Sequence, residues 1–370
     1  MYKSYIVRIY PNIAQQTLIQ KTFGCVRFVY NQCLEYKDLI YNTQGKNISK
    51  FELINYKNQI LKNTYPWLQD VDKHSLDGAI DDLEMAYNLF FKKVTNHPKF
   101  KSKKNNRKTY TTKNGNNDTS ITVDYDKRKI KIPKIKWIKA RGLRTINGRI
   151  KKATIIQNPD GRYYISILIE DNNNYFLLQN NNKIGIDLGI KDFAITSNGK
   201  KISAYNYSKK SIKNLKKAQR RLSRKQKGSK NRQKERKRVA KKIKRMINQK
   251  KDYYHKLSSR LIYENQVICL VDLDILSLLK KSEASKYIYK VSWGVFIQQL
   301  KYKGEWYGRQ IVQVDQYFPS SQICCKCGYQ NKKIKDISIR SWKCPNCGIW
   351  HDRDINAAKN ILNQGLKIIG

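Results

Sequence analysis

The chain has 370 residues, and 76 Lys and Arg against 28 Asp and Glu give it a net charge of +48 at pH 7. A body this positive repels itself unless a polyanion neutralises it, so we expect nucleic acid as its partner and binding that weakens with salt. The length and the 40% of hydrophobic residues argue against a small basic protein of the ribosomal type. No apolar run is long enough to cross a bilayer, and the start shows no signal peptide, so we expect a cytoplasmic, nucleoid-associated protein with no membrane partner.

The first half of the chain is predicted to be a β domain with helices inserted into it. Residues 2–10 alternate in the way that is typical of a strand, and apolar residues spaced by three and four predict helices over 13–95. Residues 119–170 again favour strands, with Asp160-Gly161 as a hairpin turn. We therefore expect the first strand to pair with these later strands.

The second half is predicted to alternate strands with helices. Apolar stretches at 183–205, 266–273 and 311–315 indicate strands, and residues 291–308 indicate a helix between the last two. A final helix is expected near Asp354. This order is typical of an α/β domain.

Residues 209–262 are predicted to form two long basic helices that turn at Gly228. From Lys213 to Lys250 the only acid is Glu235. A solvated charged face is the simpler interpretation, but charge so one-sided is better explained by a phosphate backbone that lies alongside. The residues that we expect to bind nucleic acid there are Lys216, Arg220, Arg224, Arg238, Lys242 and Arg245.

Four cysteines have the spacing of a metal site. Two Cys-x-x-Cys pairs, Cys324 with Cys327 and Cys344 with Cys347, are separated by sixteen residues, and a glycine follows each pair. Four thiolates at this spacing predict a tetrahedral Zn²⁺ site, which is structural because no coordination position stays open for a substrate. Cys325 lies inside the first pair and is expected to face away from the metal.

The other cysteines and the nearest histidine are expected to pack and not to bind metal. Cys25, Cys33 and Cys269 lie in apolar contexts that are typical of a core. His351 follows the second cysteine pair, but four thiolates already fill a zinc site.

Two widely separated carboxylates are candidates for a Mg²⁺ site. Asp187 lies in the apolar stretch IGIDLGI, where it is either a turn residue at a strand end or a metal ligand, since an unpaired buried carboxylate is unfavourable. Asp352 and Asp354 lie in HDRDINAAKNIL, at the start of the last predicted helix. Asp352 fits the role of a helix cap, which leaves Asp354 as the second candidate.

With these residues in view, the chain resembles the TnpB family, the OrfB-type nucleases of bacterial insertion sequences. The similarity runs along nearly the whole chain and is carried by VRIYPN, FGCVRFVYN, GIDLGIKDFA, and CCKCG followed by WKCPNCGIWHDRDINAAKNIL. It implies an α/β, RNase H-like RuvC nuclease domain with an inserted four-cysteine zinc ribbon, and an N-terminal β-barrel wedge domain that carries a helical recognition domain. The implied boundaries are 1–10 and 110–180 for the wedge, 11–109 for the recognition domain, 182–323 and 349–370 for the nuclease domain, and 324–348 for the ribbon.

The resemblance also implies a transposon-associated, RNA-guided DNA endonuclease. A guide RNA would select double-stranded target DNA beside a short motif, with base pairing reading the sequence and the protein reading the motif. Two Mg²⁺ ions would serve cleavage, one by activating water and the other by stabilising the leaving oxygen. Motif reading is assigned to residues around Arg27, Tyr30 and Asn31, with a core-facing Tyr and a capping Asn as the alternative. No oligomeric state is predicted.

The chain departs from the family at the middle acid of its catalytic Asp-Glu-Asp trio. Asp187 and Asp354 match the first and last positions, but the Glu position is Val271. Glu305 is the preferred replacement, with a solvated helix residue as its alternative. Asp272 is less favoured, because adjacent strand residues face opposite sides. Without a replacement the chain would be a nuclease-dead, RNA-guided transcriptional repressor; the two remaining acids and the ribbon favour an active enzyme.

Overall fold

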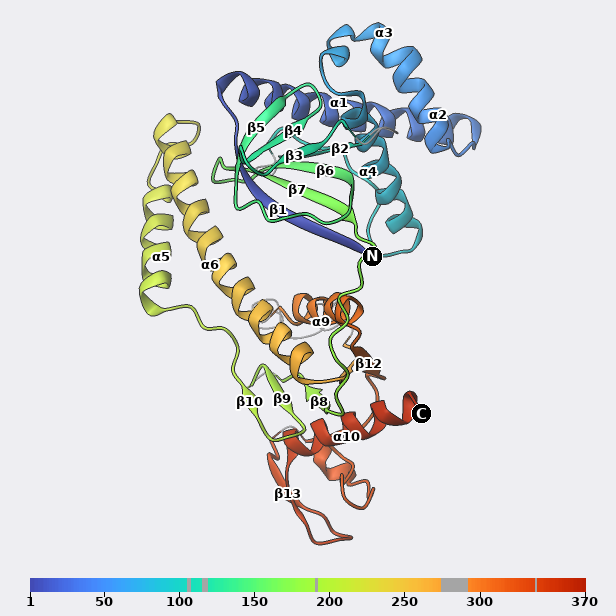
Figure 1. Ribbon diagram of the computed structural model, residues 1–370, viewed down its shortest axis with the longest axis vertical. Helices are drawn as coiled ribbons and strands as arrows, with labels where there is room; N and C mark the ends of the chain where they lie inside the picture. The colour runs from blue at the N-terminus through green and yellow to red at the C-terminus, as the bar shows by residue number, and fades with distance from the viewer. Residues whose placement is uncertain (105–107, 115–118, 190–191, 274–291, 337) are drawn as a thin grey trace. The chain divides into compact units, whose positions relative to one another are not determined.

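A computed structural model describes residues 1–104, 108–114, 119–189, 192–273, 292–336 and 338–370 (Figure 1). The chain divides into two compact units, Met1–Asn173 with Arg221–Lys241 and Asn174–Arg220 with Lys242–Gly370. The buried apolar residues of each unit form cores of their own.

A seven-stranded antiparallel sheet forms the centre of the first unit, with the strand order β2-β6-β7-β1-β5-β4-β3. The strands are β1 (Tyr2–Tyr10), β2 (Lys108–Lys113), β3 (Thr122–Asp124), β4 (Lys129–Ile132), β5 (Lys136–Arg141), β6 (Arg149–Gln157) and β7 (Tyr163–Glu170). β1 pairs with β7 on one side and with β5 on the other, so the first strand joins the later ones as the sequence predicts. Within the described residues β2 and β3 stand at the two ends of the sheet, and closure into a barrel stays a prediction.

The segment between β1 and β2 is helical, as expected. Its elements are α1 (Ile13–Gln44), α2 (Lys50–Asn55), the π-helical η1 (Tyr56–Leu61), α3 (Lys62–Thr64), the 3-10 helix η2 (Pro66–Asp70) and α4 (Lys73–Phe91). α1 begins where the side chains of Asn12 and Gln15 each accept a hydrogen bond from the other residue's backbone N–H. It ends at Gly45, whose φ of 64° favours glycine.

The helices and the sheet of the first unit share one hydrophobic core. Gly78 of α4 lies so close to β2 that an added Cβ would be 2.7 Å from the carbonyl oxygen of Thr111. Buried residues extend without interruption from Ile165 and Ile167 of the sheet to Phe23 and its neighbours in α1. The helices and the sheet therefore pack together, and the division of this unit into a wedge domain and an inserted recognition domain stays a prediction.

The second unit has the α/β architecture that the sequence predicts. Its five-stranded sheet has the order β10-β9-β8-β11-β12. The strands are β8 (Lys183–Asp187), β9 (Ala194–Thr196), β10 (Lys201–Ile202), β11 (Val267–Val271) and β12 (Gln310–Val314). Because β8, β11 and β12 are parallel, their carboxyl ends lie at one edge of the sheet.

Helices cover the two faces of this second sheet. The helices that follow β10 are α5 (Lys209–Ser223), α6 (Lys230–Glu264), α9 (Trp293–Tyr307) and α10 (Arg353–Ile368). α6 and α9 pack on the face that carries Ile186 and Leu270, and α10 packs on the face that carries Cys269 and Val312. None of the described helices is both long and apolar enough to traverse a membrane.

Candidate functional site

The four predicted zinc ligands converge between β12 and α10. One ligand atom from each of Cys324, Cys327, Cys344 and Cys347 lies within 4.8 Å of the others. The Sγ atoms of Cys324 and Cys347 are 3.6 Å apart, as are those of Cys327 and Cys344. A tetrahedral zinc ion with four thiolates puts neighbouring sulfurs about 3.8 Å apart. The cluster therefore fits zinc as it stands.

Two matching turns hold these thiols in place. In the first, the N–H of Gly328 donates to the carbonyl oxygen of Cys324 at 2.9 Å, and in the second the N–H of Gly348 donates to that of Cys344 at 2.9 Å. Both glycines have φ above 70°, a conformation that favours glycine. The repeated geometry explains why Gly follows each Cys-x-x-Cys pair.

His351 packs against the cysteine cluster. Its side chain is buried, its ring lies 4.8 Å from the ring of Trp342, and its Nε2 lies 3.1 Å from Sγ of Cys324. This distance allows an N–H of His351 to donate to a zinc-bound thiolate. The histidine is thus a packing residue, as the sequence predicts, and it also contacts Sγ of Cys324, one of the four predicted zinc ligands.

Two buried asparagines of α10 form hydrogen bonds to the first cysteine turn and the residues just before it. The backbone N–H of Cys325 donates to Oδ1 of Asn356 at 2.9 Å, and Nδ2 of Asn356 donates to the carbonyl oxygen of Ile323 at 2.7 Å. Asn360, one turn later, donates to the carbonyl oxygens of Ile323 and Ser320. The sequence analysis missed both asparagines. Their spacing of four residues on a helix face that is otherwise apolar was the available signal.

The start of α10 also bears the predicted carboxylates. Asp352 caps the helix, since its Oδ1 accepts from the N–H groups of Asp354 and Ile355, and its Oδ2 accepts from Nζ of Lys201 at 2.7 Å. Asp354 follows in the first turn, with one oxygen 3.9 Å from Nη1 of Arg340. Asp352 is therefore the helix cap that the sequence predicts, and the metal-binding role of Asp354 stays a prediction.

The fold brings Asp187 close to Asp354, although 166 positions separate them in the sequence. α10 lies on β8 so closely that an added Cβ on Gly185 would be 2.1 Å from the carbonyl oxygen of Ala358. Asp187, two residues after Gly185, faces the same helix because strand residues alternate. Burial, and next the charge of Asp354, raise the pKa of Asp187 to about 7. Two carboxylates that repel each other at a sheet edge form a site that a divalent cation would stabilise.

Three parts of the chain match described families. Residues 166–282 match the OrfB_IS605 family, described as a probable transposase, and residues 293–361 match the Cas12f1-like TNB domain. Residues 1–46 match the helix-turn-helix domain of OrfB_IS605. In this structure those residues form β1 and the single 32-residue helix α1.

A Streptomyces pristinaespiralis protein named "Putative RNA-guided DNA endonuclease" is 33% identical to this chain, over 98% of the chain and 89% of its own length. The chain belongs to the TnpB family. The Escherichia coli (strain K12) relative with the same description, InsQ, is 28% identical over 99% of the chain and 93% of its own length. The chain is also similar to Cas12f1 in a solved complex with sgRNA and target DNA, at 14% identity. The match covers 98% of this chain and 99% of the Cas12f1 chain. Its TM-score is 0.35, which supports no argument about the fold.

Val271 lies beside Asp187 at the edge of the sheet. β11 pairs with β8 so that Leu270 is opposite Ile186, and the next pair in this register is Val271 with Asp187. Val271 packs on the α10 face of the sheet, the face that Asp187 also shares. Asp272 alternates to the other face, where its Oδ1 accepts from Nε2 of Gln313. Val271 thus occupies the place from which a carboxylate would reach the pair.

The structure does not bring Glu305 to this place, and its role as the replacement stays a prediction without support from the geometry. Glu305 is exposed on α9, which packs on the opposite face of the sheet from Asp187. It lies in the last turn of α9, where Tyr307 accepts a hydrogen bond from the N–H of Leu177, before β8 begins. The first residue of α9, Trp293, donates instead to the carbonyl oxygen of Phe193, beyond the end of β8. Glu305 is therefore near the amino ends of the parallel strands, and Asp187 is at a carboxyl end.

The basic residues predicted to bind nucleic acid are exposed. The six are Lys216, Arg220, Arg224, Arg238, Lys242 and Arg245. Arg238 forms an ion pair with Glu235, one turn earlier on α6. The turn between α5 and α6 is held by Nη1 of Arg232, which donates to the carbonyl oxygens of Leu222 and Lys225.

The three N-terminal candidates have different surroundings. Tyr30 is buried, and burial raises the pKa of its hydroxyl. The amide of Asn31 is occupied, because its Nδ2 donates to the carbonyl oxygen of Lys101 at 3.1 Å and its Oδ1 accepts from the N–H of Lys101 at 2.8 Å. Arg27, one turn before Asn31 on α1, lines a pocket.

Proposed function

We propose that this protein is an RNA-guided DNA endonuclease that cleaves target DNA with a metal ion held by Asp187 and Asp354. The observation that carries the proposal is the meeting of these two carboxylates, which come from β8 and α10 and occupy the first and last acid positions of the family's trio. The names of the relatives support the same activity for this chain.

The carboxylate pair suits Mg²⁺. Mg²⁺ commonly takes one or two carboxylates from a protein and completes its shell with water and substrate phosphates. Asp187 and Asp354 would supply the carboxylates, and the DNA would supply the phosphate. Bound Mg²⁺ would activate water and stabilise the leaving oxygen. The helix cap formed by Asp352 would hold Asp354 in the orientation that metal binding needs, because it fixes the first turn of α10.

The cysteine cluster suits structural zinc. With Cys324, Cys327, Cys344 and Cys347 as ligands, no coordination position is left for a substrate. The zinc would stabilise the ribbon that Asn356 and Asn360 join to α10.

Guide RNA and double-stranded DNA are the proposed partners. The charge of +48 supports binding to both, and the exposed basic residues of α5 and α6 would contact phosphates. Base pairing between guide and target would read the sequence, while the protein would recognise a short motif and the shape of the heteroduplex. Chromosomal DNA as the target would place the protein in the cytoplasm, at the nucleoid.

One experiment tests the proposal. The protein is purified with RNA co-expressed from its own locus and is offered target DNA with Mg²⁺. We expect cleavage, and we expect Asp187→Ala or Asp354→Ala to lower its rate on the order of a thousandfold while DNA binding persists. Guided binding without any cleavage by the natural protein would contradict the endonuclease and leave a guided DNA-binding protein.

A further inference from the structure

We propose that the pocket that α1 forms with residues 101–103 and with Lys108 and Thr109 binds a single phosphate group of a nucleic-acid backbone. The proposal rests on the proposed function, since it assigns one backbone contact of the nucleic acid that the protein handles. It gives Arg27 the role of a phosphate ligand that fixes the position of the nucleic acid, and not the role of a base reader.

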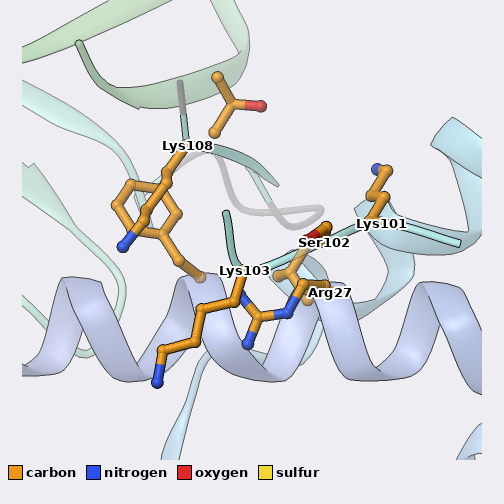
Figure 2. A pocket seen from close by; sticks show the side chains of 8 residues that line it. Arg27, Lys101, Ser102, Lys103 and Lys108 are labelled. Carbon is orange, nitrogen blue, oxygen red and sulfur yellow. The ribbon is translucent and has the colours of Figure 1, made fainter. Parts of the chain in front are cut away.

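The pocket is small and its walls are partly apolar (Figure 2). Its volume is about 150 Å³, and Phe23 and Val26 of α1 contribute buried side chains to its lining. Pockets that hold drug-sized ligands usually measure about 300–1,000 Å³. This pocket therefore has room for a group of the size of a phosphate, and none for a nucleoside.

Four cationic side chains line the pocket, and one of them, Lys101, forms an ion pair with Asp82. The other three are Arg27, Lys103 and Lys108. Within the described part of the chain, none of the three forms an ion pair; Lys108 donates to Oε1 of Gln20 at 3.1 Å. None of the described residues that line the pocket is acidic. Apolar walls lower the local dielectric, so an anion placed here would interact with these cations more strongly than at an open surface.

The cations are held together in spite of their mutual repulsion. Burial, followed by the charges of Arg27 and Lys103, lowers the pKa of Lys108. An anion in the pocket would relieve this repulsion, as a divalent cation would relieve that of two carboxylates. The cationic groups thus form a site that is complementary to negative charge before any ligand arrives.

Asn31 and Tyr30 of α1 hold Lys101, and with it one wall of the pocket, in place. Asn31 clamps both backbone groups of Lys101, and Nζ of Lys101 lies 4.0 Å from the ring centroid of Tyr30 and 2.9 Å from Oδ2 of Asp82. In Figure 2 the amine of Lys101 points away from the other three cationic groups. Lys101 is therefore used to fix the loop against α1, and a pocket fixed in this way loses little entropy when it binds.

The test is equilibrium binding of the full-length protein to two probes, a short DNA duplex and a single-stranded RNA of the same length. We expect Arg27→Gln to weaken binding of at least one probe about tenfold, as for a lost charge-assisted hydrogen bond, and to lower the slope of log affinity against log salt by about one. Lys104→Gln is the matched control, because Lys104 is exposed on the same loop and does not line the pocket. This control should change affinity less than about twofold.

Coupling between Arg27 and Lys108 identifies the pocket itself. If both side chains hold one phosphate, the free-energy losses of Arg27→Gln and Lys108→Gln are not additive in the double variant, whereas those of Lys104→Gln and Lys108→Gln add. A loss confined to the duplex assigns the phosphate to target DNA, and a loss confined to the RNA assigns it to the guide. Melting temperatures confirm that the variants fold, and Arg27→Lys, which keeps the charge, should recover part of the affinity.

Other outcomes overturn the proposal. The phosphate site is ruled out if the losses for Arg27→Gln and Lys108→Gln are additive. It is also ruled out if Arg27→Gln behaves like Lys104→Gln while both probes still bind. Either outcome leaves the endonuclease proposal intact. Failure of the natural protein to bind either probe would remove both proposals. None of these readings depends on DNA cleavage.

Discussion

The two proposed metal sites of the second unit differ in how the chain builds them. The cysteine cluster draws its ligands from a span of 24 residues, and local turns alone give them their geometry. The carboxylate pair draws its ligands from β8 and α10, and only the packing of that helix on that strand joins them. The cluster has all four of its ligands, while the position beside Asp187 is occupied by Val271. A site specified locally can be judged from spacing, whereas a site assembled over long range can be judged only from the fold.

The largest effect should come from the local centre. We expect Cys344→Ser to reduce zinc from one ion per chain to none, because the apparent binding free energy of a structural zinc is about 10–16 kcal/mol and depends on the full ligand set. Metal analysis of the purified protein measures this. Cys325→Ser is the control, since Cys325 lies outside the cluster. Zinc retained in Cys344→Ser, or lost in Cys325→Ser, would show that the ligands are assigned wrongly.

The carboxylate centre should respond to pH, and the next largest effect follows from this. Burial and the charge of Asp354 raise the pKa of Asp187 to about 7, so Mg²⁺ must displace a proton below that pH. We expect Mg²⁺ affinity to fall about tenfold for each pH unit below 7 and to level off above it. Titration of Mg²⁺ binding from pH 5 to pH 9 checks this.

The same shift has a consequence for stability with a defined sign. The ordinary pKa of this carboxyl is 3.8, so between about pH 4 and pH 7 the folded chain holds a proton that the unfolded chain has released. Without Mg²⁺, the contribution of Asp187 to stability is therefore present below pH 4 and is lost as pH rises to 7. Asp187→Asn should remove this dependence from the melting temperature. A dependence that persists in the variant would belong to another group.

A smaller effect should follow from adding the missing acid. In Val271→Glu a third carboxylate would lie beside Asp187, and we expect Mg²⁺ affinity to rise about tenfold and the melting temperature without Mg²⁺ to fall, because three acids repel one another. Val271→Gln has the same size without the charge and is the control. If the two variants bind Mg²⁺ equally, the register of β11 and β8 does not place this residue at the metal.

The smallest effect is expected at Glu305. Because it lies on the opposite face and near the opposite edge of the sheet, Glu305→Gln should leave cleavage within about twofold of the natural protein and stability within about 0.5 kcal/mol. Cleavage rates and melting temperatures measure both. A loss as large as that expected for Asp354→Ala would reinstate Glu305 as a ligand.

The sequence predicted what depends on local spacing. The cysteine ligands, the capping role of Asp352 and the presence of most strands in both units follow from patterns within a few residues. The position of Glu305 away from Asp187 follows from topology, since a helix that joins two parallel strands must end where the second strand begins, at the amino edge of the sheet. That a residue lies on a helix next to a predicted strand does not determine which face or edge of the sheet its side chain reaches.

Other features depend on contacts that no local pattern contains. The shared core of the first unit arises where Gly78 allows α4 to approach β2. A single glycine in a predicted helix does not indicate by itself that a strand packs against it. The role of Asn31 as a clamp requires that the backbone of Lys101, 70 residues later, comes to lie beside it. The asparagines of α10 could be noticed as polar residues on an apolar face, but their partners in the first cysteine turn could not be named.

α10 connects the two proposed metal sites. The first turn of α10 carries Asp354. Its side chains Asn356 and Asn360 hold the first cysteine turn, and its backbone contacts Gly185. If the cluster holds zinc, a chelator that removes it would thus loosen the anchor of the helix that carries Asp354, a proposed catalytic carboxylate. The resulting inhibition would arise at a distance, and added Mg²⁺ would not reverse it. Zinc supply in the cell would then set how much of the protein is competent to cut DNA.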